Sequence, residues 1–235
     1  MRRELWAVLL VGLVGCARPA PPPPGVPVSG TILYQGSKRA SKVLTMEAEE
    51  DCQKLHPTPV SEERIVVTAQ GALQNAFVYI KAGLGDRRFP APTEAVVLEQ
   101  RGCQFVPRVL ALRAGQTLTV KNADPVSHNI HPTPRENRDW NQQQPPGAPD
   151  LQRKFAVPEV MIPVKCNVHN WMRSYIGVLD HPYLAVTGPE GRFAWPDLPP
   201  GRYTLAVWHE ALGELTREVD VEAGKPVTIS LAYRD

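Results

Sequence analysis

Two histidines, one cysteine and one methionine constrain the possible fold of this chain more than any other feature. Cys166 is followed by His169 and Met172, and His128 lies further upstream. Cys166, His169 and Met172 can all point at one ion from a single tight loop between two strands. The fourth ligand, His128, must then come from a neighbouring strand end. Two imidazoles, a thiolate and a weak axial thioether are the donor set of a trigonal copper site for one-electron transfer. The sequence therefore predicts one mononuclear copper ion held between strands.

The residues around this set favour strands. Apolar and polar residues alternate from Gly115 to Asn122, and the break from Asn122 to Pro125 comes just before His128. The 235 residues include 25 prolines, and helical periodicity is weak everywhere except over residues 51–55 and 61–63. Short alternating runs punctuated by glycine and proline are typical of β-sandwiches. We therefore expect an all-β protein.

Four features together resemble the cupredoxins, the small blue copper proteins. They are a Gly-x-x-x-x-Val strand, a His-Asn pair at its end, a Cys-x-x-His-x-aromatic-Met loop and a closing Tyr-Ile-Gly-Val strand, at Gly115, His128, Cys166 and Tyr175. The stretch from Ala95 to Asp180 is similar to plastocyanin, and its ligand loop is more similar to amicyanin. The resemblance implies a Greek-key sandwich over residues 93–180, with Asn129 bracing the cysteine loop. It also implies the copper ligands His128, Cys166, His169 and Met172.

Other interpretations of these residues remain open. A lone cysteine in a β protein is usually a small buried hydrophobe, and Met172 could fill the core. Zinc accepts cysteine and histidine, but structural zinc sites normally close with four strong ligands and rarely include a thioether. The chain has no CxxCH motif for haem, and its cysteines are too scattered for an iron–sulfur cluster. We expect His131 and His56 to be structural or surface residues.

The N-terminus predicts export. Two arginines precede an apolar run from Leu5 to Val14, which is too short to span a bilayer. The run ends in Leu13-Val-Gly-Cys16, which looks like a bacterial lipobox. We expect residues 1–15 to be a lipoprotein signal peptide, Cys16 to carry the lipid, and the proline-rich residues 16–26 to be a semi-rigid tether. The protein would face the periplasm or the cell exterior; an ordinary cleaved signal and an uncleaved anchor are the alternatives.

The remaining cysteines suggest a disulfide. With Cys16 assigned to the lipid and Cys166 to copper, Cys52 and Cys103 are left. An exported protein is expected to oxidise such a pair, so we predict a Cys52–Cys103 bond. The alternative, a second metal site of Cys52 and His56, would offer only two ligands.

The segments that flank the copper domain resemble another family. Residues 181–235 contain the Gly-x-Phe and Leu-Pro-Pro-Gly-x-Tyr patterns that begin at Gly191 and Leu198. They look like the later half of the transthyretin-like domain found beside carboxypeptidases, and residues 27–92 fit its missing first half. We therefore predict that the copper domain, residues 93–180, is inserted into a second small β-sandwich. Alternatively, residues 27–92 add strands to the cupredoxin sheets.

These features favour an electron carrier in the cell envelope that exchanges electrons with redox proteins, with one imidazole edge of His169 facing solvent as the port. The alternatives are a copper chaperone or store, and a binding module in which Trp195 or Trp208 stacks on a sugar. The long connection over residues 132–158 could cap the copper or dock a partner. No nucleophile, general base or carboxylate pair stands in a recognisable arrangement, so we predict no enzyme. The net charge of +2 does not suggest nucleic-acid binding.

Overall fold

The computed structural model describes residues 24–37, 42–46 and 49–234. The predicted signal peptide, Cys16 and the tether up to residue 23 lie outside the described residues and stay predictions. Strands dominate the described part of the chain, whose one helix, α1 (Glu50–Lys54), is short, so the all-β prediction is confirmed. Within the described ranges, no helix has the length and apolar character needed to cross a membrane.

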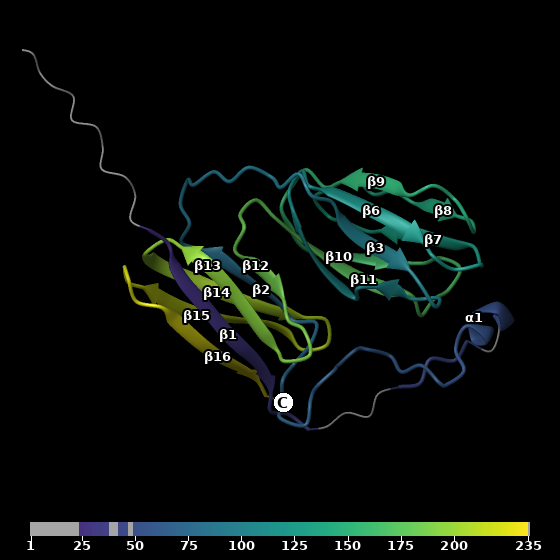
Figure 1. Cartoon of the computed structure of the whole chain (residues 1–235), viewed down its shortest axis with the longest axis horizontal. Coiled ribbons are helices and arrows are strands. Elements are labelled where there is room, and N and C mark those ends of the chain that lie inside the picture. The colour runs from purple at the N-terminus through teal and green to yellow at the C-terminus, as the bar shows by residue number, and fades with distance from the viewer. Residues whose placement is uncertain (1–23, 38–41, 47–48, 235) are drawn as a thin grey trace, which may run out of the picture.

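Strands from both ends of the chain form one β-sandwich, called here the flanking sandwich (Figure 1). In its first sheet β1 pairs with β13 on one side and runs parallel to β16 on the other. In its second sheet β2 lies between β12 and β14, and β15 forms the edge. The bounds are β1 (Val26–Tyr34), β13 (Arg192–Leu198), β16 (Val227–Tyr233), β12 (Leu184–Val186), β2 (Phe77–Ala82), β14 (Gly201–His209) and β15 (Gly213–Val221). Both β1 and β2 thus share sheets with strands that follow residue 183. The insertion of a copper domain into a transthyretin-like sandwich stays a prediction.

The alternation of buried and less buried residues in β1 explains how the flanking sandwich builds its core. Every second residue of β1 is buried, and Val28 and Ile32 enter a core with Trp195 and Tyr203. Gly30 is required in β1 because a Cβ there would collide with the ring of Phe193 and the backbone of the neighbouring strand. The core of this sandwich is therefore closed by strands that are distant in sequence.

The second sandwich, called here the ligand sandwich, is built from the middle of the chain. One sheet has the order β5-β11-β10-β7-β8 and the other β4-β3-β6-β9. The bounds are β3 (Val96–Gln100), β4 (Phe105–Val106), β5 (Val109–Arg113), β6 (Thr117–Asn122), β7 (His128–Pro132), β8 (Gln142–Gln144), β9 (Leu151–Lys154), β10 (Glu159–Lys165) and β11 (Arg173–Leu179). Aliphatic side chains from both sheets fill its core. The long connection over residues 132–158 contributes β8 and β9, which extend the two sheets at their edges.

A buried junction joins the two sandwiches. Phe77 and Ala206 of the flanking sandwich pack with Val109 of the ligand sandwich. Gly177 in β11 has no room for a Cβ because the ring of Phe77 lies directly against it. Residues of both sandwiches thus share one small apolar cluster. Strand β11, which contributes Tyr175 and Leu179 to this cluster, begins directly after Met172.

Candidate metal centre

Four predicted ligands lie on two segments at one end of the ligand sandwich. His128 is the first residue of β7, and Cys166 follows the last residue of β10. His169 and Met172 lie in the turn that leads into β11. The turn is tight because the Met172 amide donates to the His169 carbonyl at 3.0 Å and the Cys166 amide donates to the Met172 carbonyl at 3.3 Å. The loop between two strands that the spacing predicted is therefore present.

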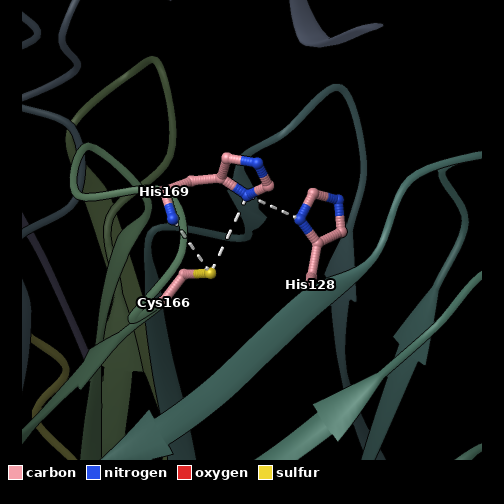
Figure 2. Close-up of side chains that lie close together, drawn as sticks. All are labelled: His128, Cys166 and His169. Carbon is pink, nitrogen blue, oxygen red and sulfur yellow. Dashed lines mark hydrogen bonds between the residues drawn. The ribbon is translucent and has the colours of Figure 1, made fainter. Parts of the chain in front are cut away.

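Three of these side chains converge on one buried point (Figure 2). The Nδ1 atoms of His128 and His169 are 3.0 Å apart, and His169 Nδ1 is 3.8 Å from Cys166 Sγ. Each of the three side chains can offer one donor atom such that all lie within 4.8 Å of one another. Two imidazole nitrogens and one sulfur in so small a volume fit a trigonal metal ion. Met172 is also buried, and its role as axial donor stays a prediction.

The surroundings of Cys166 favour ionisation of its thiol. Burial raises its pKa, but a hydrogen bond with His128 and the backbone amide of His169, 3.4 Å from Sγ, oppose this effect. The pKa of Cys166 therefore ends below the ordinary thiol value. Asn129 accepts a hydrogen bond at 3.1 Å from the backbone amide of Asn167, next to Cys166, and so makes the contact expected of a brace for the cysteine loop. Since the thiolate is the metal-binding form, this environment favours metal binding.

Asp124 contacts the candidate ligand His128, and the sequence did not single it out. Its carboxylate lies 2.8 Å from His128 Nε2 and accepts the backbone amides of Gly102 and Cys103 at 2.6 and 2.8 Å. Burial raises the pKa of Asp124, but the hydrogen bonds from His128 and the two amides outweigh burial and lower it. An ionised carboxylate can only accept, so His128 Nε2 carries the proton and its Nδ1 is directed toward Cys166 and His169. The only sequence signal was an acidic residue four positions before the histidine.

The structure does not show the solvent-facing edge of His169 that was predicted as the electron port. His169 is 2% exposed, because Trp171 packs beside its ring and residues 49–60, called here the cap segment, place Cys52 and Glu49 against its outer nitrogen. Cys52 in α1 forms the predicted disulfide with Cys103, and its Sγ lies 3.7 Å from His169 Nε2. Glu49 lies 4.0 Å from the same nitrogen. The prediction that an edge of His169 faces solvent is therefore wrong for this conformation.

The other histidines and the tryptophans lie outside the cluster. His131 contacts Asn167 and Asp139 at the surface, and His56 contacts the Gly102 carbonyl at 2.7 Å. Trp195 is buried in the flanking core, and Trp208 packs against a tyrosine at the junction. Neither tryptophan stands free on the surface as a platform for a sugar.

Comparisons with known proteins find partial similarities among solved structures. No family model and no curated protein matches the chain. A copper-containing nitrite reductase from Thermus scotoductus matches with a TM-score of 0.33 and 17% identity over 49% of this chain, which spans 25% of that enzyme. A Cu(I) methionine mutant of amicyanin matches with a TM-score of 0.32 and 17% identity, over 43% of this chain and 97% of amicyanin. A purple cupredoxin from Nitrosopumilus maritimus matches with a TM-score of 0.28 and 22% identity, over 32% of this chain and 81% of that protein.

Proposed function

We propose that this protein is a one-electron carrier of the cell envelope that holds one copper ion between His128, Cys166 and His169. The observation that carries the proposal is the convergence of two Nδ1 atoms and one sulfur in a buried cluster. Met172 would add the weak axial thioether. Bound copper would supply the Cu(II)/Cu(I) couple, and this mixture of nitrogen and sulfur donors suits both oxidation states.

The residues around the cluster support electron transfer because they hold the ligands in place before any ion binds. Asp124 orients one imidazole, and Asn129 fixes the start of the ligand loop. Ligands with fixed positions move little when the charge of the ion changes, which is what a rapid one-electron carrier needs. Redox proteins of the envelope would be the partners, and a lipid on Cys16 would hold the protein at the membrane.

A copper chaperone or store is the second candidate. The observation that favours it is the coverage of His169 by the cap segment, since a store benefits from a closed site more than a carrier does. The two candidates differ in what the ligands must achieve: a carrier needs a reversible couple, whereas a store needs slow release or controlled exchange.

The first experiment adds Cu(II) to the purified protein and records its visible and paramagnetic spectra. We expect an intense thiolate-to-copper absorption in the wild type, its loss in Cys166→Ala, and a weakened or reshaped band in His128→Ala. His131→Ala is the matched control, because His131 lies beside the ligand loop without joining the cluster. A Cys166→Ala protein with the wild-type spectrum would end the proposal.

The second experiment separates carrier from store through Met172. In a carrier, Met172→Leu removes the axial donor at similar volume and should raise the potential, whereas Met172→Gln supplies a harder oxygen and should lower it. Each tenfold change in the ratio of affinities for the two oxidation states shifts a one-electron couple by ~59 mV. Voltammetry that shows no reversible couple in the wild type, or no ordered shift across the series, would favour the store.

The anchor has its own test. Cys16→Ala should release the protein from membranes or block its processing, because the lipobox cysteine is the residue that would carry the lipid. A membrane-bound, lipid-labelled Cys16→Ala product would eliminate the lipoprotein hypothesis, and would leave the copper proposal untouched.

A further inference from the structure

The cap segment closes the metal centre through a single covalent bond. Cys52 is buried, and its sulfur stands directly over the outer nitrogen of His169. Among the residues that the structure describes, the cap makes two polar contacts with the ligand sandwich besides those of Cys52. His56 contacts the Gly102 carbonyl at 2.7 Å, and Glu49 lies 4.0 Å from His169. Leu55 and Val60 add partly buried side chains to the core of the ligand sandwich, and Met46 of the preceding arm is buried in it. Helix α1 itself, within the described residues, is therefore held mainly by the disulfide and by the side chain of Leu55, while the apolar anchors Met46 and Val60 lie at the two ends of the segment.

The cap also has little internal stability. Helix α1 has five residues, and Glu49 at its start makes no side-chain capping bond. Helices this short are not stable on their own in water. At the base of the cap, the Leu44 amide donates to the Val60 carbonyl and the Glu62 amide to the Lys42 carbonyl, so these two arms pair with each other. A segment with few contacts and a short helix belongs to the parts of a protein that open locally at low free energy.

The other half of the disulfide is firmly held. The backbone amide of Cys103 donates to Asp124 at 2.8 Å, and its carbonyl accepts from Trp171 Nε1 at 2.9 Å. The Cys103 side chain is fully buried. Cleavage of the bond would therefore release the Cys52 side, while Cys103 would keep its place beside the metal centre.

We propose that the Cys52–Cys103 disulfide is a redox-operated latch that controls access to the outer edge of His169. A dithiol reductant transfers two electrons and two protons to the bond, which gives two thiols in the protein and a disulfide in the reductant. The freed cap then swings away, and His169 Nε2 faces solvent. The role of this opening, access for an electron-transfer partner, rests on the proposed function.

The test labels histidines in the metal-free protein with diethyl pyrocarbonate at neutral pH, followed by mass mapping. His169 should be protected in the oxidised wild type and should react about tenfold faster or more after reduction with dithiothreitol and removal of the reductant. The Cys52→Ala/Cys103→Ala variant should react like the reduced protein. His56→Ala, which keeps the disulfide and removes the other close contact, is the matched control and should stay protected.

Two histidines in the same chain calibrate the labelling. His131, with a side chain 19% exposed, should react at a similar rate in all samples, and His209, which is 1% exposed in the flanking sandwich, should stay unreactive. Labelling of His169 and His209 together would mean global unfolding and would overturn the latch. Continued protection of His169 in the reduced protein and in the double variant would overturn it as well. Because no copper is present, failure of the copper proposal leaves this result unchanged.

Discussion

Asp124→Asn tests whether the carboxylate beside His128 prepares this histidine to bind metal. The carboxylate serves three donors: His128 Nε2 and the backbone amides of Gly102 and Cys103. Asparagine has nearly the same shape but only one acceptor oxygen, and its amide group would face one of these buried donors. An unsatisfied buried donor costs about 1–3 kcal/mol in the free energy of unfolding. Loss of a carboxylate partner typically weakens metal binding ~10–100-fold.

Two measurements separate these effects. Chemical denaturation of the metal-free protein gives the change in unfolding free energy, and competition with a chelator of known affinity gives the change in copper affinity. Asp139→Asn is the control, because Asp139 contacts the surface residue His131 and its side chain is 58% exposed. A loss of stability with unchanged copper affinity would refute the reasoning, because Asp124 would then only hold the turn at residues 102 and 103.

Three further predictions concern the junction and the flanking sandwich. Arg108 and Glu210 form a bidentate ion pair with side chains only 10% and 6% exposed, so Glu210→Ala should lower the unfolding free energy by about 3–5 kcal/mol in denaturant titrations. Gly177→Ala would push a methyl group into a buried ring and should cost ~1–3 kcal/mol, whereas Gly188→Ala, in open space, should show no comparable loss. Burial, and next the charge of Arg108, lower the pKa of His209 to about 4. The unfolded chain then binds more protons between pH 6.5 and 4, so stability should fall by roughly 2 kcal/mol from pH 6.5 to 5, and His209→Gln should flatten this slope.

The sequence predicted that His128, Cys166 and His169 lie close together, because the information for this is local. Cys166, His169 and Met172 lie within one turn, and such a turn can be inferred from spacing and from the strands on either side. His128 could be added because a break in alternation marked the end of the preceding strand. The all-β class followed from the same punctuation by proline and glycine. In each case the neighbours along the chain carry the signal.

Asp124 and the edge strands could not be predicted in this way. Asp124 lies in a stretch that marks the end of a strand, and its role depends on the amides of residues 102 and 103, which only tertiary structure brings to it. The long connection over residues 132–158 contains many polar residues and prolines, so its sequence gives little indication of strands. Strands β8 and β9 form there because they pair with β7 and β6 at the edges of the two sheets. Both cases depend on contacts between segments rather than on residue type.

The wrong prediction about His169 shows that the sequence of a ligand loop does not indicate whether another segment covers it. A histidine on a loop between two strands presents an edge to solvent unless another segment covers it. The cysteine count predicted the Cys52–Cys103 disulfide. It did not predict that Cys103 lies next to Asp124, which contacts His128. For this reason it also did not predict that Cys52 lies against His169. The segment that covers His169 is thus more than a hundred residues away from it in the sequence. Substitutions in the ligand loop should change spectrum and potential, whereas substitutions in the disulfide should change access.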